Sequence, residues 1–387
     1  MRSLVSIRRI TDIQPIPNKD RIVCAFVDGW TIVVQKDQFE IGDPCVYFEP
    51  DSFLPDGDPR WQMLVDKKAK TFNQQNGHVL KTIRMGGVYS NGFCVPFSAC
   101  PELSEIDVSA EYLNIDVTEI MGISKYDPPE ELSRGGATKG NFPHFIPKTD
   151  EERCQNLNRT IFDRTIHTAE YTNSAGEVIQ VERHPENTDD TEYEASVKMD
   201  GSSMTVYHND GTVGVCSRNL ELKIEEAGST FVDMFNKLRF SEVLPKLGNI
   251  AIQGELCGPG IQGNQEKFDT FQFFVFKIYD IDAKRYLQPH ERREMFNTMY
   301  ALCKEVMDRE GNPDAIKCLH HVVVLHERVK LKDLNLHTVA DLLRFADGPS
   351  FNPSVKREGV VFKRYDPDTS KTFSFKAISE AWLANKG

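Results

Sequence analysis

The sequence has no long apolar run, no closely paired cysteines and no excess of positive charge. No apolar stretch approaches the roughly 18 residues needed to span a bilayer, and the amino-terminal "MRSLVSIRRITDIQPI" alternates like a strand, so we expect neither a membrane span nor a signal peptide. The nine cysteines contain no C-x-x-C pair. This pattern argues against a zinc site or a disulfide framework and favours an intracellular, reducing compartment.

Basic residues are outnumbered, since 46 Lys and Arg oppose 58 Asp and Glu for a formal net charge of −12. Non-specific affinity for nucleic acid comes from neutralised phosphates, so this balance argues against a nucleic-acid coat protein. A local basic groove remains compatible with it. The candidate is residues 354–376, where Lys and Arg outnumber Asp and Glu.

The first 110 residues consist of short alternating runs, such as "RIVCAFV", "WTIVVQ" and "PCVYFEP", separated by clusters of Pro, Gly, Asn and Asp. This spacing predicts an all-β, OB-like barrel over residues 1–110. Residues 111–147 are rich in Pro, Gly and charge, which is typical of a linker or mobile segment.

Residues 148–387 alternate strands with helices, and we expect an α+β domain there. Apolar residues at helical spacing predict helices over 229–240 and 289–307, the second opened by Pro289. Residues 271–281 and 358–365 are expected to be strands. At 387 residues the chain is long enough for both domains to bury their own cores.

The stretch "SVKMDGSSMTVY" at 196–207 delivers Lys198 into an Asp-Gly turn between two apolar runs. One interpretation is a β-hairpin in which Lys198 is a solvated strand residue, because Asp-Gly is a strong hairpin signal. The other is a lysine held rigidly for chemistry. The rest of the chain decides between them.

Five further clusters follow Lys198 in a fixed order. They are "SRN" at 217–219, "IQGELCGPG" at 252–260, "FFVFKIYDI" at 273–281, "REGVVFKR" at 357–364 and "FSFKAIS" at 373–379. Each is weak alone, but their order resembles the covalent nucleotidyltransferase superfamily of polynucleotide ligases and capping enzymes. The resemblance implies an ATP-grasp-like nucleotidyltransferase domain with antiparallel sheets and flanking helices, preceded by the OB-like barrel.

Domain order narrows the resemblance. DNA ligases and capping enzymes of this superfamily place an OB domain after the catalytic domain, and the short stretch after Lys376 leaves no room for one. The barrel-like start, "FIPKTDEERCQN" at 145–156 and the stretch at 27–55 look like the nick-sealing RNA ligases of the Deinococcus and Naegleria type. With these included, the resemblance covers nearly the whole chain.

This resemblance implies an ATP-dependent RNA ligase that seals 3′-OH/5′-phosphate nicks. Lys198 attacks the α-phosphorus of ATP to give lysyl-AMP, AMP passes to the 5′-phosphate, and a 3′-hydroxyl then displaces it. The expected partner is a nicked duplex RNA or RNA/DNA hybrid with an RNA 3′-OH end, and we expect a monomer that engages no membrane. Mg²⁺ or Mn²⁺ is the expected metal, held largely through water because Mg²⁺ dehydrates reluctantly.

The residue types suit this chemistry. A free lysine, with a pKa of about 10.4, is mostly protonated at neutral pH. Burial and nearby cations lower the pKa of an amine and release its lone pair. We therefore expect Lys376, with or without a metal ion, to place a positive field around Lys198.

The resemblance also implies roles for the other residues. Asp200, Glu255 and Glu358 are assigned to metal-bound water and ribose hydroxyls, without a division of duties among them. The nucleotide contacts are assigned to Arg218, Glu255, Phe276, Lys363 and Lys376, with Lys198 as the residue that AMP modifies. Phe276 would stack on adenine, with Phe274 as the competing choice, and Lys363 is the weaker phosphate candidate.

Two features remain open. Relatives often carry a second lysine two positions before the last one, where this chain has Ser374; Lys371 would have to reach in, or the site works with one cation. In the barrel, Trp30, Tyr47 and Phe48 form either an RNA platform or core. The competing functions are a DNA ligase or capping enzyme, and a non-catalytic RNA-end binder.

Overall fold

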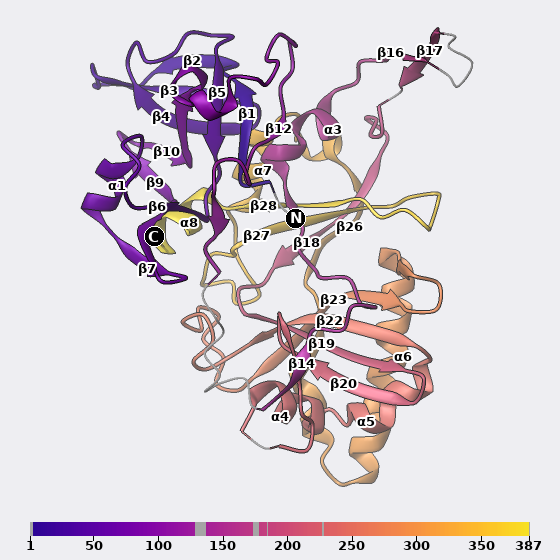
Figure 1. The fold of residues 1–387 in the computed structure, drawn as a ribbon. Helices are drawn as coiled ribbons and strands as arrows, with labels where there is room; N and C mark the ends of the chain where they lie inside the picture. Colours follow the sequence, from indigo (N-terminus) through magenta and orange to yellow (C-terminus); the bar gives the residue numbers. More distant parts are fainter. Residues whose placement is uncertain (1–2, 128–136, 173–177, 184, 227, 387) are drawn as a thin grey trace. The chain divides into compact units, whose positions relative to one another are not determined.

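The computed structural model describes residues 3–127, 137–172, 178–183, 185–226 and 228–386, which fall into two compact units (Figure 1). Unit 1 comprises Met1–Pro129, Gln155–Asn158 and Glu380–Gly387, and unit 2 comprises Glu130–Cys154 and Arg159–Ser379. Among the described residues, no helix has the length and apolar character that a membrane span requires.

Unit 1 is built from short, mostly antiparallel strands with few helical turns. Its elements are β1 (Val5–Arg9), β2 (Asp12–Pro15), β3 (Ile22–Val27), β4 (Trp30–Gln35), β5 (Pro44–Phe48), β6 (Ser52–Pro55), α1 (Gln62–Lys67), β7 (Lys70–Phe72), β8 (Gln75–Val79), β9 (Thr82–Met85), β10 (Val88–Asn91), β11 (Phe93–Pro96), β12 (Ile115–Asp116), β13 (Ser124–Lys125) and α8 (Glu380–Lys386). The strand orders are β11-β5-β1-β12, β2-β3-β4, β13-β6-β8-β7 and β10-β9.

The aromatic residues considered for an RNA platform belong to the core of unit 1. Trp30, Tyr47 and Phe48 are each 0% exposed. Their polar atoms are bonded internally, since the Trp30 indole donates to Asn156 Oδ1 at 2.8 Å and the Tyr47 hydroxyl donates to the Asn91 carbonyl at 2.9 Å. The apolar alternation of these strands therefore reflects side chains that point into the barrel core. Of the two interpretations of the three aromatic residues, the structure supports core and not an RNA platform.

Part of the segment predicted as a linker is packed into the same unit. Leu113, Val117, Met121 and Ile123 are buried in the core around β1 and β5, and β12 pairs with β1. Leu113, Val117 and Met121 recur every fourth residue without forming a helix, and the segment has no alternating run, so the sequence pattern did not indicate how it packs. Residues 128–136 of the predicted linker lie outside the described residues.

Unit 2 contains two large sheets. Its strands are β14 (Thr138–Asn141), β15 (Glu152–Arg153), β16 (His167–Thr172), β17 (Val178–Arg183), β18 (Glu192–Lys198), β19 (Ser202–Asn209), β20 (Thr212–Cys216), β21 (Leu220–Leu222), β22 (Ile250–Cys257), β23 (Gln272–Asp280), β24 (Arg285–Tyr286), β25 (Leu319–His321), β26 (Val324–Lys330), β27 (Gly359–Arg364) and β28 (Ser374–Ile378). The eight-stranded sheet runs β14-β21-β20-β19-β22-β23-β24, with β25 beside β23, and the five-stranded sheet runs β15-β28-β27-β18-β26.

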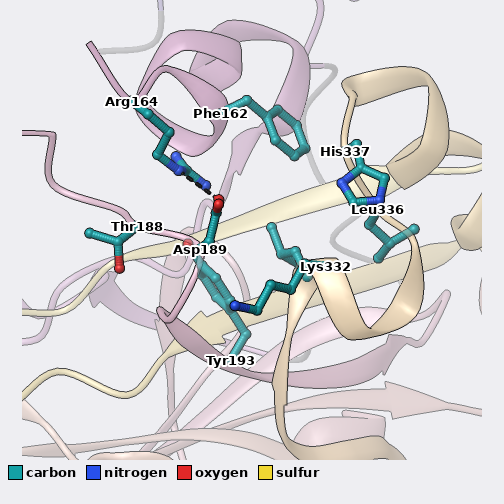
Figure 2. Close-up of a pocket in the computed structure, with 9 residues that line it drawn as sticks. Phe162, Arg164, Thr188, Asp189, Tyr193, Lys332, Leu336 and His337 are labelled. Atoms are coloured by element: carbon teal, nitrogen blue, oxygen red, sulfur yellow. Dashed lines mark hydrogen bonds and ion pairs between the residues drawn. The ribbon is translucent and has the colours of Figure 1, made fainter.

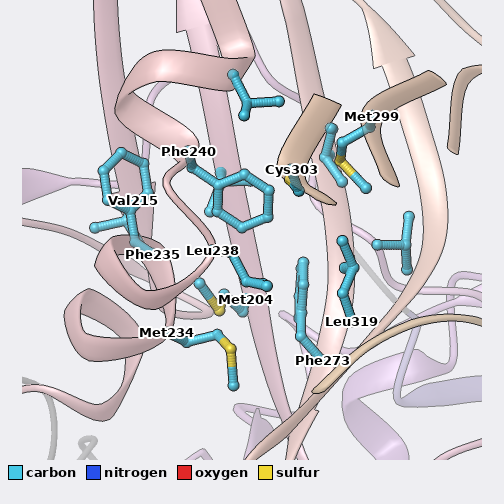
Figure 3. Close-up of a cluster of buried hydrophobic side chains, with 14 of the residues drawn as sticks. Met204, Val215, Met234, Phe235, Leu238, Phe240, Phe273, Met299, Cys303 and Leu319 are labelled. Atoms are coloured by element: carbon cyan, nitrogen blue, oxygen red, sulfur yellow. The ribbon is translucent and has the colours of Figure 1, made fainter. Parts of the chain in front are cut away.

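Helices cover one face of the eight-stranded sheet. They are α4 (Thr230–Lys237), α5 (Phe240–Val243) and α6 (Pro289–Arg309), while α3 (Asn158–Phe162) and α7 (Val339–Ala346) lie elsewhere in the chain. Ser229 caps α4, and Pro289 opens α6 behind a capping box of Gln288 and Glu291. Figure 3 shows Phe240 and Phe273 in the core between these helices and the sheet.

Strand alternation places a mixed set of residues on the other face of this sheet, where Ala251 belongs to a small apolar cluster with Tyr207 and Tyr279. In β22, Ile250, Ile252 and Leu256 join the helix-covered core, whereas Gln253 and Glu255 take the alternate positions. In β18 of the five-stranded sheet, Glu194 and Lys198 likewise alternate with apolar neighbours. The two sheets thus each carry one row of charged and polar residues, and these rows form the candidate site.

Candidate active site

The Asp-Gly turn after Lys198 is not a hairpin. Strand β18 pairs with β26 and β27 in the five-stranded sheet, whereas β19 pairs with β20 and β22 in the eight-stranded sheet. The turn carries the chain from one sheet to the other. Gly201 is required for close approach, because a Cβ there would lie 2.5 Å from the Leu256 carbonyl oxygen, and its amide donates to the Glu255 carboxylate.

Lys198 is surrounded by carboxylates. Its Nζ donates to Glu358 Oε2 at 2.6 Å, with the two side chains 28% and 10% exposed. Burial alone lowers the pKa of Lys198, but the charges of Glu358, Glu255 and Asp200 outweigh it and raise the pKa above its ordinary value. In the protein without nucleotide or metal, the charges acting on Lys198 are thus mainly negative, and the positive field expected from Lys376 and a metal ion stays a prediction.

The same crowding acts on Glu255. Burial, together with the charges of Glu358 and Asp200, raises the pKa of Glu255 to about 7 against the opposing charge of Lys198. Such an excess of negative charge fits a divalent cation. Within the described ranges, no group of three or more His, Cys, Asp and Glu is placed to ligate a metal ion directly.

Lys376 lies one strand beyond, on β28. Lys198 is opposite Gly359 on β27, and Val361 of β27 is opposite Lys376, so the two lysines share one face of the sheet. Lys376 is 9% exposed and donates to Asp150 Oδ1 at 3.0 Å. Burial lowers the pKa of Lys376 to about 8, and the charges of Arg153 and Lys198 act in the same direction against Asp150.

The two candidate adenine platforms differ in exposure. Phe274 is 0% exposed and stacks on His320 at 4.7 Å within an aromatic cluster with Phe268 and Phe351. Phe276 is half-buried, and the register between β22 and β23 shifts beside it. A base can stack only on an accessible ring, so the geometry favours Phe276.

Lys363 is bound to the protein rather than presented to solvent. It is 8% exposed, its Nζ donates to the Phe276 carbonyl, and it lies 5.9 Å from the Phe276 ring centroid. Burial and the charge of Arg292 hold the pKa of Lys363 well below its usual range. Its burial and its hydrogen bond to the protein backbone weaken the assignment of Lys363 as a phosphate ligand.

Arg218 is exposed on the turn between β20 and β21. Across the residues that the structure describes, no contact joins it to the other predicted site residues. The predicted basic groove at 354–376 is also dispersed: Arg357 is buried and donates to the Ala346 carbonyl, and Lys371 is exposed beside Asp368.

The structure adds charged residues that the sequence did not indicate. Glu151 pairs with Lys277 at 2.6 Å, and Glu194 pairs with Arg292 at 2.6 Å, with both of those side chains 1% exposed. Lys277 interrupts the apolar strand 273–281, and Asp150 and Glu151 lie in the quoted stretch 145–156. These two features of the sequence could have indicated additional charged residues at the site. Neither of them showed which residues would form ion pairs.

A separate cavity of about 90 Å³ lies elsewhere in unit 2 (Figure 2). Phe162, Tyr193 and Leu336 line it beside an ion pair between Arg164 and Asp189 at 3.0 Å. Tyr193 alternates with Lys198 along β18, so the cavity is on the opposite face of that strand. It is too small for a nucleotide, whose sites measure roughly 300 Å³ or more.

Comparison with known families identifies the class of protein. A family described as an OB-fold domain matches residues 4–97, and a family described as RNA ligase matches residues 191–378. The architecture is thus an OB-fold domain followed by a nucleotidyltransferase-like RNA ligase domain, and the predicted fold class is confirmed. Comparison with curated protein sequences gives no match.

Solved structures of Naegleria gruberi RNA ligase are similar over nearly the full length of both chains. The structure with pyrophosphate is 39% identical, covers 100% of this chain and 99% of that chain, and has a TM-score of 0.79. A variant with ATP and Mn is 39% identical with coverage of 99% and 99% and a TM-score of 0.80. A variant with AMP and Mn is 38% identical, with the same coverage and TM-score.

The chain belongs to the RNA ligase family. The resemblance to the Naegleria type is confirmed by these structures, while the Deinococcus part of it stays a prediction.

Proposed function

We propose that this chain is an ATP-dependent RNA ligase that seals 3′-OH/5′-phosphate nicks through lysyl-AMP on Lys198. The observation that carries the proposal is the Lys198 amine, held 2.6 Å from Glu358 at a turn between two sheets, with Glu255 and Asp200 close enough to act on its charge. The ATP and Mn in structures of the Naegleria ligase support the choice of nucleotide and metal.

In the first step, the Lys198 lone pair forms a bond to the α-phosphorus of ATP while the bond to the pyrophosphate oxygen breaks. The amine must first lose a proton, and Glu358 already accepts a hydrogen bond from it. Glu255, with a pKa raised to about 7, is able to hold a proton at neutral pH. Lys376 is placed on the same sheet face to bind the α-phosphate.

A divalent ion held through water by Asp200, Glu255 and Glu358 would neutralise charge on the phosphates. Phe276 would stack on the adenine and Arg218 would contact phosphate or ribose, with Lys363 as the weaker phosphate candidate. The nicked strand would have an RNA 3′-OH end opposite RNA or DNA, and the protein would act as a monomer.

The first test is incubation with α-labelled ATP and Mg²⁺ or Mn²⁺, followed by a denaturing gel. We expect a labelled band for the unaltered protein and for Lys139→Ala, a matched control that removes an exposed lysine paired with Glu221. Lys198→Ala should give no band. Intact mass would show whether the protein is already adenylylated, and absence of both label and added mass would favour the non-catalytic RNA-end binder.

The substrate is tested next with nicked duplexes. We expect sealing when the upstream strand ends in RNA and little sealing of an all-DNA nick. Equal rates on DNA would contradict the substrate proposal and favour a DNA ligase. Labelling by GTP in place of ATP would favour a capping enzyme.

A further inference from the structure

Ser374 occupies the position where relatives often have a second lysine. It lies on β28 two residues before Lys376, so both residues are on the same face of the strand. Lys371 does not replace the missing cation, because its side chain is 69% exposed and lies 3.9 Å from Asp368. The sequence therefore leaves open which residue supplies a second positive charge to the phosphates of ATP.

The structure brings Lys277 to Ser374 through one carboxylate. Lys277 Nζ lies 2.6 Å from Glu151 Oε1, with the side chains 14% and 12% exposed, and the Ser374 hydroxyl donates to Glu151 Oε2. Lys277 is opposite Gln253 in the sheet register, on the face that also carries Glu255. The Glu151 carboxylate therefore bridges the polar faces of the two sheets beside the candidate site.

The preceding residue makes the same type of contact with the other lysine. Asp150 Oδ1 accepts a hydrogen bond from Lys376 Nζ at 3.0 Å. Two consecutive carboxylates thus hold two ammonium groups, Asp150 on Lys376 and Glu151 on Lys277. Carboxylate and phosphate oxygens accept the same charge-assisted hydrogen bonds.

We propose that Lys277 takes the place of the missing lysine, so that Lys277 and Lys376 together bind the phosphates of ATP. Asp150 and Glu151 hold the two ammonium groups until the phosphate oxygens replace them. The inference rests on the proposed function, since it concerns the nucleotide used to modify Lys198.

The main test combines Lys277→Met with Ser374→Lys. Losing a charge-assisted contact should raise the KM for ATP in lysine adenylylation by roughly tenfold or more for Lys277→Met. A lysine at position 374 faces the same Glu151 carboxylate, so adding Ser374→Lys should restore most of the ATP affinity. Lys139→Met is the matched control, and it should leave the KM unchanged.

A second variant separates phosphate binding from folding, because Lys277→Met alone leaves Glu151 partly buried without its cation. Glu151→Gln/Lys277→Met removes both charges of the pair. We expect this variant to keep a Tm close to that of the unaltered protein while its KM for ATP stays raised. A normal KM for ATP in Glu151→Gln/Lys277→Met would overturn the inference. So would a Lys277→Met/Ser374→Lys protein that folds but keeps the raised KM. If the unaltered protein itself takes no label, the proposed function fails instead.

An independent observation concerns unit 1. From Lys67 to Pro101 the chain carries no Asp or Glu, although the whole chain has 58 acids against 46 bases. This stretch contains Lys67, Lys68, Lys70 and Lys81, which we call the lysine face. Burial lowers the pKa of Lys81, and the charges of Lys70 and Lys68 lower it further against that of Asp51, so Lys68 and Lys70 lie near Lys81. Lys67 is next to Lys68 in the sequence and is exposed.

The lysine face also carries an accessible aromatic ring. Lys70 Nζ lies 5.0 Å from the ring centroid of Tyr126, which is half-buried, whereas Trp30, Tyr47 and Phe48 are core. Like charges repel when they are gathered on one surface. Clustered lysines beside an aromatic ring are typical of surfaces that bind a phosphate backbone.

We infer that the lysine face binds the sugar-phosphate backbone of the RNA substrate. The test is the triple variant Lys67→Ala/Lys68→Ala/Lys70→Ala, compared with a charge-matched Lys246→Ala/Lys304→Ala/Lys317→Ala variant on the helical side of unit 2. Only the first should bind a nicked RNA duplex more weakly, with the slope of log K against log salt reduced by about 2 to 3. Lysine adenylylation should be unchanged in both.

A binding curve and salt slope equal to those of the unaltered protein would overturn this second inference. Loss of lysine adenylylation in the first triple variant would also overturn it, because the defect would then lie in folding or nucleotide use. The proposed function would still stand in the first case, since the label on Lys198 is measured without RNA.

Discussion

Replacing Glu358 by Gln tests whether the acids around Lys198 set its protonation. The substitution keeps a hydrogen-bond acceptor near Lys198 Nζ but removes the charge that lies 2.6 Å away. Two unit charges 2.6 Å apart interact by about 6 kcal/mol at an effective dielectric constant of about 20. This interaction favours the charged form of Lys198, and it is the upper limit of what the substitution removes.

The remaining acids reduce the expected effect. Glu255 and Asp200 still act on Lys198 after the substitution, and the lysine side chain is 28% exposed to water. We therefore expect the pKa of Lys198 to fall in Glu358→Gln, by less than the full interaction with Glu358 would give. The fall should occur without nucleotide and without metal.

The assay is competitive acetylation as a function of pH, with the Lys198 peptide quantified by mass spectrometry. Asp347→Asn is the control, because it removes a carboxylate whose ion-pair partner, at 2.7 Å, is Lys356 and not Lys198. The Lys198 profile of this variant should match that of the unaltered protein. An unmoved or upward-shifted Lys198 profile in Glu358→Gln would refute the electrostatic reasoning.

The raised pKa of Lys198 also makes the stability of the protein depend on pH. Folding raises the pKa of Lys198 above its ordinary value, so its contribution to stability is complete below about pH 10 and is lost as the pH rises through the folded pKa. Glu358→Gln should reduce this alkaline loss, as measured by urea unfolding at several pH values.

Four other substitutions give separate checks. Lys198→Arg should abolish labelling by ATP, because a guanidinium stays protonated at any working pH. The denaturing gel measures this loss of label, and a labelled band would contradict the assignment of Lys198 as the nucleophile. Phe276→Ala should raise the KM for ATP by roughly fivefold to a hundredfold, since stacking on an aromatic ring contributes about 1 to 3 kcal/mol per base. Phe274→Ala should instead lower the free energy of unfolding by about 3 to 5 kcal/mol, because its ring is core. The reverse pattern would exchange the two roles. Glu194→Gln leaves Arg292 buried without its charge partner and should destabilise the protein by about 3 to 5 kcal/mol in urea unfolding, and a loss under 1 kcal/mol would show that water reaches the pair.

Periodicity and turn chemistry determined much of the fold. The helix predicted over 289–307 is α6, Pro289–Arg309, because a proline at the first position and a regular apolar stripe are local properties of the chain. The strands of unit 1 were indicated by alternation for the same reason. Residues 113–123 were missed, since they contain no alternating run and their apolar side chains are ordered by packing in the core around β1.

The Asp-Gly turn shows the limit of local signals. Its residues favour a hairpin, but pairing partners from distant strands place β18 and β19 in different sheets. Only tertiary structure decides such pairing, because the hydrogen bonds of each strand go to residues far away in the sequence.

The sequence by itself determined the order and types of the candidate site residues, Lys198, Asp200, Glu255, Glu358 and Lys376, because both are properties of the chain before it folds. It did not determine the electrostatics. The tertiary structure decided that three acids surround Lys198, that Phe274 is covered while Phe276 is accessible, and that Lys277 meets Ser374 through Glu151. The physical reason is that charge interactions and burial depend on distances between residues, and folding sets these distances by bringing together strands that lie far apart in the sequence.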